Sequence, residues 1–253
     1  MSKVRLYLEP GLIKDELELK GKDYIHRFSD ILRLKKKESI SVFDGCGREF
    51  SFLIISLSKK GIVLKRQKLE RSEKKEPREV ILGFPLMREG KIDYILQKAT
   101  ELGVSAFIPF IASRSLVKTG GEKIERWRRI IIEAARQSDR LWLPKIEESL
   151  AFNQLIKRPC DLRLFAQKGG ADIYSSVKKH HRQVLIIVGP EGDLSPQEIM
   201  ALKQEEFAAV SLSLNILRSE TAAIFAAGMI RDILDRFDSP SLEVSAGKKM
   251  IKP

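Results

Sequence analysis

The most restrictive feature of the sequence is the regular exchange of strand-like and helix-like segments from residue 80 onward. Apolar residues recur every three or four positions over residues 88–102 and again over 122–139, as in amphipathic helices. The strand-like segments around them are VILGFPL, VSAFIPFI, DLRLFA and QVLIIVG. This alternation predicts an α/β domain with a mainly parallel sheet. Such sheets bind ligands beyond the carboxyl ends of their strands.

One of these ends continues as GPEGDLSPQEI, residues 189–199. Pro190 ends the strand because proline cannot donate to the ladder, and Ser195 with Glu198 forms the capping box that begins a helix. The loop therefore spans residues 189–194. Its acidic Glu191 disfavours a phosphate and suits a ribose hydroxyl, an amine or a cation. A tight strand-to-helix connection with a solvated glutamate is the alternative.

A second candidate loop is LSLNILRSETAA, residues 212–223. The alternation of Leu212 and Leu214 predicts the end of a short strand, and a helix with many small residues follows. Arg218 and Glu220 stand at the start of that helix, where its dipole favours the glutamate and disfavours the arginine. An arginine in this place suggests a role toward an anion or a partner, although a surface ion pair is the alternative.

The first 70 residues have a different pattern, which predicts a small β-barrel. VRLYLE reads as one strand, and residues 39–69 read as three strands joined by turns at Asp44-Gly45 and Lys60-Gly61. A short amphipathic helix is expected within DYIHRFSDILRLKKK. Its apolar face comprises Ile25, Phe28, Ile31 and Leu32.

The charged stretch ERSEKKEPRE separates the two patterns and reads as a linker. We therefore expect four regions along the chain. They are a barrel domain over residues 1–70, a linker over 71–78, an α/β domain over 79–240 and a flexible tail over 241–253.

The net charge of +12 is concentrated near the start of the chain. Residues 1–75 contain 19 lysines and arginines against 11 aspartates and glutamates. A basic excess of this kind favours a polyanion such as nucleic acid, while a solvated basic surface is the alternative.

Few features suggest a metal, a disulfide or a membrane. The two cysteines and three histidines show no metal-ligand spacing, so no metal is expected. Two cysteines also form no disulfide framework, which indicates a reducing compartment. No apolar run approaches the ~20 residues of a membrane helix. We expect a cytoplasmic protein.

The two loop motifs together with three upstream stretches resemble the RsmE family of 16S ribosomal RNA uracil-N3 methyltransferases, in the SPOUT superfamily. Upstream, QKATELGVSAFIPF precedes SRSLVK, and ERWRRIIIEAARQSDR precedes LP. HRFSDILRLKKKESISVFDGCG is similar to the family's N-terminal domain. The resemblance covers about residues 3–237 in the family's order.

This resemblance implies a PUA-like β-barrel that binds RNA, followed by a SPOUT α/β domain with a deep trefoil knot. It implies methylation of N3 of a uridine in 16S rRNA of the small subunit, with S-adenosylmethionine (SAM) as methyl donor, by a homodimer that needs no metal. The knot loops would hold the cofactor. The residues carried over as cofactor-binding are Phe165, Ala166, Gly189, Pro190, Glu191, Gly192, Leu212, Leu214, Asn215, Ile216, Leu217, Thr221 and Ala222.

The reaction removes the N3 proton of uracil, so a base or groups that stabilise the uracil anion would assist it. Glu220 could be a base or could cap its helix. The catalytic candidates are Arg114, Gln137, Arg140, Arg218 and Glu220. His26 could stack on RNA, but a satisfied histidine is the simpler interpretation. The residues expected to contact RNA phosphates are Lys3, Arg5, Arg27, Arg33, Lys35, Lys36 and Lys37, the lysine run being equally consistent with a solvated turn.

The sequence departs from the family at three positions. Asp193 replaces the second glycine after Pro-Glu, and Ser213 and Asn215 replace a glycine and an arginine. The changes at Ser213 and Asn215 support the competing hypothesis, a SPOUT-fold RNA-binding protein without catalysis or with a different RNA. An oxidoreductase is disfavoured because no strand is followed by G-x-G-x-x-G.

Overall fold

The computed structural model describes residues 4–115 and 123–238, which form two compact units. Of the described residues, the first unit comprises 4–76 and 132–143, and the second comprises 77–115, 123–131 and 144–238. The expected tail and Lys3 lie outside the described residues. Residues 132–143, which the sequence placed in the second domain, pack within the first unit.

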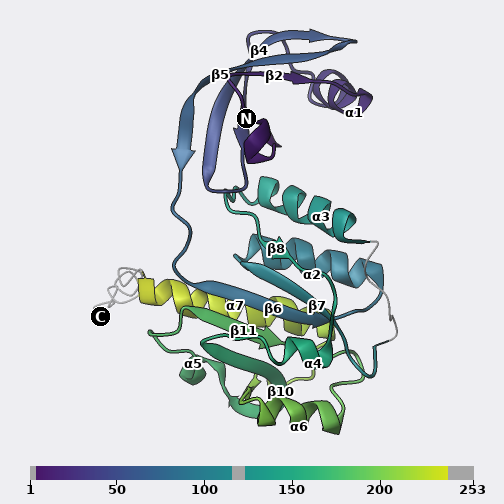
Figure 1. Cartoon of the computed structure of the whole chain (residues 1–253), viewed down its shortest axis with the longest axis vertical. Coiled ribbons are helices and arrows are strands. Elements are labelled where there is room, and N and C mark those ends of the chain that lie inside the picture. The colour runs from purple at the N-terminus through teal and green to yellow at the C-terminus, as the bar shows by residue number, and fades with distance from the viewer. Residues whose placement is uncertain (1–3, 116–122, 239–253) are drawn as a thin grey trace, which may run out of the picture. The chain divides into compact units, whose positions relative to one another are not determined.

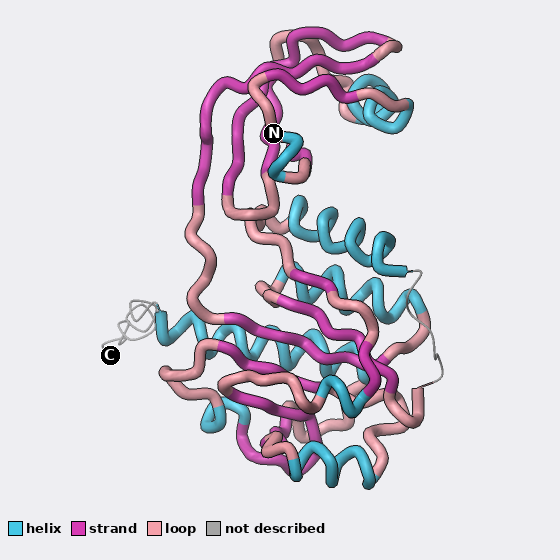
Figure 2. The backbone as a smooth tube through the Cα atoms, viewed as in Figure 1, coloured by secondary structure: helices cyan, strands magenta, loops and turns pink. Residues whose placement is uncertain are grey.

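The first unit is built on a five-stranded sheet in the order β1-β3-β4-β5-β2 (Figures 1 and 2). The parallel pair β1 and β3 is the exception among antiparallel neighbours. The edge strands β1 and β2 are not paired with each other, so the sheet does not close and is a half-barrel. The expected N-terminal β domain is confirmed, as an open half-barrel. The strands are β1 (Arg5–Tyr7), β2 (Glu16–Leu19), β3 (Ser39–Phe43), β4 (Arg48–Ser58) and β5 (Gly61–Ser72).

The helix of the first unit is shorter than the sequence suggested. It comprises α1 (Lys22–His26) and a π-helical turn, η2 (Arg27–Ile31). In that turn the amide of Leu32 donates to the carbonyl of Arg27 at 2.9 Å, five residues back. Since a π turn holds more residues than an α turn, the apolar stripe loses its register. Phe28 is buried in the core, but Ile31 is 63% exposed, so its expected place on the buried face was wrong.

The second unit is built on a parallel sheet in the order β12-β10-β11-β6-β7-β8, with β9 also paired to β7. The expected α/β class and parallel sheet are confirmed. The knot stays a prediction. The strands are β6 (Glu79–Pro85), β7 (Ala106–Ile111), β8 (Lys145–Ile146), β9 (Leu150–Ala151), β10 (Leu162–Asp172), β11 (Gln183–Ile187) and β12 (Ala208–Ser211).

Helices accompany this sheet, and the long α7 runs behind β6 and β11 in Figure 1. On the other side, Phe152 of α4 and Leu202 of α6 share a core with Phe165, Leu185 and Ile187 of the strands. The division between the units falls within α3. The helices are α2 (Glu89–Glu101), α3 (Ile124–Gln137), α4 (Phe152–Leu155), α5 (Ile173–Ser176), α6 (Pro196–Gln204) and α7 (Ser219–Asp238), with a 3₁₀ turn η1 (Pro10–Leu12) in the first unit.

One expected strand end was wrong. β12 ends at Ser211, so Leu212 and Leu214 lie in the loop that follows it. The alternation of the two leucines had suggested a strand, but β12 has already left its hydrogen-bonded partner β10 at that point. Leu214 is 93% exposed, which is incompatible with a place inside a buried strand.

Candidate functional site

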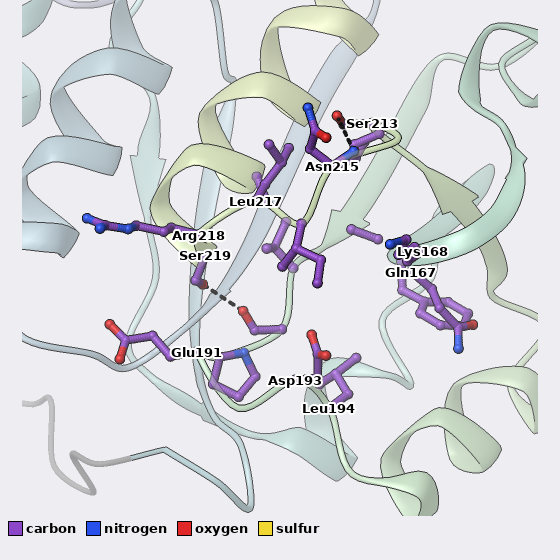
Figure 3. A pocket seen from close by; sticks show the side chains of 18 of the residues that line it. Gln167, Lys168, Glu191, Asp193, Leu194, Ser213, Asn215, Leu217, Arg218 and Ser219 are labelled. Carbon is purple, nitrogen blue, oxygen red and sulfur yellow. Dashed lines mark hydrogen bonds between the residues drawn. The ribbon is translucent and has the colours of Figure 1, made fainter.

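A pocket of about 720 Å³ lies in the second unit, at the carboxyl ends of β11 and β12 and beside residues 165–168 of β10. Three loops and the start of α7 contribute its walls (Figure 3). Its volume lies within the range of about 300–1,000 Å³ that is typical of small-molecule sites. This is the place that the parallel-sheet rule predicts for a ligand.

The loop after β11 is held in shape by its own backbone and by the helix that follows. The amide of Asp193 donates to the carbonyl of Pro190 at 3.0 Å. Ser195 accepts from the amide of Glu198, and the Glu198 carboxylate accepts from the amide of Ser195, which confirms the expected capping box. Leu194 is buried below the loop. The loop is thus a preformed wall of the pocket.

Asp193 has a left-handed backbone, with φ of 57°. Only glycine adopts this region without strain, and aspartate and asparagine tolerate it better than other residues. The glycine that the family usually has here is therefore explained by backbone conformation, and aspartate is a permissible replacement. In Figure 3 the Asp193 side chain rises toward the pocket beside Leu194.

The segment after β12 is joined to the first loop by a hydrogen bond. Ser219, the first residue of α7, donates its hydroxyl to the carbonyl of Gly189 at 2.6 Å (Figure 3). Within the loop, the amide of Asn215 donates to the hydroxyl of Ser213 at 3.1 Å. Ile216 lines the pocket and is 85% exposed. An apolar side chain exposed at a pocket wall suits a ligand with an apolar or aromatic face.

The third wall is a bulge in β10. Ala166 and Ala171 both pair with Val210 of β12, so the four residues between them, 167–170, loop out of the strand. Gln167 and Lys168 line the pocket from this bulge, on the side opposite Glu191 and Arg218 in Figure 3. A Cβ atom on Gly170 would lie 2.7 Å from the backbone of Val210, so glycine is required for the close approach.

Lys91, in the first turn of α2, joins two carboxylates at the pocket. Its ammonium contacts Glu191 of the first loop and lies 3.0 Å from Glu220 of α7. These hydrogen bonds raise the pKa of Lys91, and the bond from Lys91 holds the pKa of Glu191 below its ordinary value. A cation in the first turn of a helix opposes the dipole. That signal, used above for Arg218, could have found Lys91 in the sequence.

Glu198 connects the loop after β7 to the start of α6. Its carboxylate accepts from the amide of Ser113 at 2.8 Å and from the Ser113 hydroxyl at 3.0 Å, besides the amide of Ser195. Burial alone would raise the pKa of Glu198, but these hydrogen bonds hold it below its ordinary value. Next to Ser113, Arg114 donates to the carbonyl of Gly192 at 2.5 Å. This arginine, a catalytic candidate, therefore braces the first loop.

Two other catalytic candidates, Gln137 and Arg140, belong to the first unit. The side-chain amide of Gln137 donates to the Glu133 carboxylate at 3.1 Å, one turn back in α3. The backbone amide of Arg140 donates to the carbonyl of Ala135 at 3.0 Å, which ends the helix.

Arg5, expected to contact RNA, is a partly buried residue that makes structural contacts within the first unit. Its guanidinium is 10% exposed and pairs with Glu49 at 2.7 Å. It also donates to the carbonyls of Ala135, Arg136 and Arg140 at 3.0–3.2 Å, where it caps the end of α3. A cation is favourable at that end of a helix.

The other basic candidates of the first unit are accessible. Arg33, Lys35, Lys36 and Lys37 are exposed, and Arg27 is half-buried. His26 is exposed and pairs with Asp30 at 2.7 Å, which accounts for it without RNA.

Ten of the thirteen expected cofactor residues line the pocket, and Arg218 lines it as well. Gly192, Leu214 and Thr221 belong to the same segments but are not part of the lining. Sequence reasoning missed the following lining residues: Lys91, Gln167, Lys168, Val188, Asp193, Leu194, Ile199, Ser213 and Ser219.

Within residues 4–115 and 123–238, no group of three or more histidine, cysteine, aspartate or glutamate side chains is placed to hold a metal. Among the helices formed by these same residues, none has the length and apolar character needed to cross a membrane.

Known proteins are similar to this chain in sequence and in structure. Residues 74–231 match the RNA methyltransferase domain family. Ribosomal RNA small subunit methyltransferase E of Synechocystis sp. is 31% identical over 240 residues, which cover 91% of this chain and 78% of that protein. Its counterpart from Bacillus subtilis is 30% identical over 220 residues, or 81% of this chain and 86% of the relative.

Solved structures agree with these relatives. The crystal structure of a ribosomal RNA small subunit methyltransferase E from Neisseria gonorrhoeae bound to S-adenosyl methionine is similar to this chain with a TM-score of 0.82. The sequence identity is 26%, and the match covers 92% of this chain and 98% of that one.

Proposed function

Because this chain belongs to the RNA methyltransferase family, and within it to the ribosomal RNA small subunit methyltransferase E proteins, we propose that it methylates N3 of one uridine in 16S rRNA. The methyl donor is SAM, as in the related Neisseria gonorrhoeae structure. The observation that carries the proposal is the pocket of about 720 Å³ between the bulge of β10 and the loops after β11 and β12.

The residues of the pocket fit this cofactor. Apolar side chains from the loop after β12 and from α7, Leu212, Ile216, Leu217 and Ala222, suit the face of an adenine ring. The same loops carry backbone N–H and C=O groups that can pair with the polar edge of a base. When bound, SAM supplies an electrophilic methyl group on a sulfonium. No metal is needed for such a transfer.

The chain must assist the loss of the uracil N3 proton and stabilise the anion that forms. Arg218 lines the pocket and is exposed, so it is free to approach the uracil oxygens. Cationic donors of this kind lower the energy of a developing anion. Glu220 is paired with Lys91, which favours a positioning role over that of a general base. Arg114, Gln137 and Arg140 remain catalytic candidates, with Arg114 also bracing Gly192.

The target uridine must leave its base pair or stack to reach the pocket. Exposed basic residues of the first unit, Arg33, Lys35 and Lys36, together with the half-buried Arg27, would contact the RNA backbone. We place the protein in the cytoplasm, where ribosomal RNA is modified. A homodimer is also proposed, and exposed Tyr94 of α2 and Phe225 of α7 are available for a second copy.

The test combines binding with product mapping. Calorimetry measures SAM affinity, and small subunits from a strain that lacks this modification serve as substrate. A methyl at N3 blocks Watson–Crick pairing, so reverse transcription stops at the modified uridine, and mass spectrometry identifies the nucleoside. We expect one stop that depends on SAM. A methyl at another position keeps the enzyme class and overturns the N3 assignment.

The competing hypothesis, an RNA-binding protein without catalysis, predicts subunit binding without SAM binding.

Arg218→Ala tests the proposed anion stabilisation. The control is Arg182→Ala, which also removes one exposed positive charge but lies outside the pocket lining. We expect Arg218→Ala to lower kcat by at least about 100-fold, the scale of a lost oxyanion donor, and to leave SAM affinity in place. Equal turnover in the two variants would exclude that role for Arg218.

A further inference from the structure

Lys91 joins three segments that are distant in sequence. It lies in the first turn of α2, while Glu191 lies 100 residues later in the loop after β11 and Glu220 lies 129 residues later in the first turn of α7. Its Nζ atom lies 3.0 Å from Glu220 Oε2 and contacts Glu191 Oε1. Lys91 and Glu191 both line the pocket. One ammonium thus connects two of the segments that must stay together if the pocket is to keep its shape.

The location of this ammonium is unfavourable without its partners. Lys91 lies at the amino end of α2, where the helix dipole repels a cation. Glu220 is favourable at the amino end of α7 and is mostly buried, with 14% of its side chain exposed. The electrostatic attraction of Lys91 to the two carboxylates offsets its unfavourable interaction with the helix dipole. The position of its ammonium therefore depends on both carboxylates.

We propose that Lys91 is a positioning residue that latches the loop carrying Glu191 to the start of α7, and thereby holds the cofactor pocket in its binding form. The inference rests on the proposed function only for the identity of the ligand. Lys91 acts through Glu191 and Glu220. Since Glu191 is half exposed, the latch contributes little to global stability. The latch instead keeps the loop ordered and thereby increases the affinity for the cofactor.

The latch has a defined pH dependence. The groups that face Glu191 are Lys91, Arg88, Arg218 and Glu220, with Asp193 in its own loop. Lys91 lowers the pKa of Glu191, so the latch is intact above the ordinary value of 4.5 and opens as pH falls through the lowered value. The raised pKa of Lys91 keeps the ammonium charged throughout the neutral range.

The experiment compares Lys91→Met with Lys98→Met. Lys98 lies on the same helix and pairs with Glu101 at 2.9 Å, so its replacement also removes one lysine ion pair from α2 but leaves the pocket untouched. We expect Lys91→Met to weaken SAM binding about tenfold, a loss of about 1.4 kcal/mol, and Lys98→Met to leave it unchanged. Lys91→Arg should retain most of the affinity because it preserves the charge.

Two further measurements separate positioning from a general structural role. The affinity gap between wild type and Lys91→Met should persist near neutral pH and close below about pH 4.5, the ordinary value for glutamate. Hydrogen exchange of the cofactor-free protein should rise over residues 191–194 in Lys91→Met and not in Lys98→Met.

The inference is overturned if Lys91→Met binds SAM as tightly as Lys98→Met and shows the same exchange in the loop. Failure of the proposed function has a different signature, namely a wild-type protein that does not bind SAM. In that case the exchange measurement alone decides whether Lys91 orders the loop.

Discussion

The loops after β11 and β12 form two walls of one pocket, but they are held very differently. The first loop is fastened by the Ser195 capping box, by Arg114 and by Lys91, and its Leu194 is buried. The second loop has hydrogen bonds only two residues apart in sequence, such as Asn215 to Ser213, and leaves Leu214 and Ile216 almost fully exposed. One wall is therefore built before the ligand arrives, whereas the other offers apolar surface that a ligand can cover.

This difference divides the expected effects of substitutions. Changes at the buried anchors of the fastened loop should alter stability as well as affinity, because they leave buried polar groups without partners. Changes in the exposed loop should alter affinity alone, because surface side chains contribute little to stability.

Glu198→Ala is the strongest test of the fastened wall. The side chain is 7% exposed and accepts from Ser113 and Ser195, and its loss leaves these donors unsatisfied. We expect a loss of about 3 kcal/mol in unfolding free energy, measured by denaturant titration. Gln204→Ala, exposed at the end of the same helix, is the control and should be nearly neutral. An unchanged free energy of unfolding in Glu198→Ala would mean that the loop holds its shape without this anchor.

The same residue predicts a pH effect. Hydrogen bonds lower the pKa of folded Glu198, so its stabilisation is complete above the ordinary value of 4.5 and is lost as pH falls through the lowered folded value. The difference in unfolding free energy between wild type and Glu198→Gln should therefore shrink on acidification from pH 6 to pH 3. A gap that stays constant over this range would show that the carboxylate charge is not what stabilises the loop.

Ile216→Ser is the corresponding test of the exposed wall. Ile216 lines the pocket and Leu214 does not, although both are exposed in the same loop. Covering part of an isoleucine is worth about 1–2 kcal/mol, so SAM affinity should fall about tenfold with no change in unfolding free energy. Leu214→Ser is the matched control, expected to bind nearly as well as wild type. Equal losses in both variants would restore Leu214 to the cofactor site.

The same contrast explains which parts of the site could be predicted from sequence. The fastened loop was readable because a capping box and a Gly-Pro turn are local patterns. The alternation of Leu212 and Leu214 suggested a strand, although hydrogen bonding to β10 ends at Ser211. The bulge with Gln167 and Lys168 was missed because it depends on how two strands pair.

Long-range contacts were also beyond local patterns. Arg5 and the carbonyl of Arg140 are 135 residues apart, and the sequence alone gave Arg5 the same surface role as the neighbouring basic residues. Lys91 was likewise not singled out from the sequence. Its meaning depends on two carboxylates that only the folded chain brings to it.

The smallest expected effect concerns Asp193, where the chain departs from its family within the fastened wall. Its φ of 57° favours glycine, but glycine also makes the unfolded chain more flexible, so the two contributions of Asp193→Gly should nearly cancel, within about 0.5 kcal/mol. Alanine tolerates the left-handed conformation less well than aspartate, so Asp193→Ala should lower the free energy of unfolding by about 1 kcal/mol. Asp193→Asn removes the charge and preserves the conformation. If the departure is a matter of backbone alone, Asp193→Asn binds SAM like wild type, and a marked change in its affinity would instead show that the carboxylate acts on the ligand.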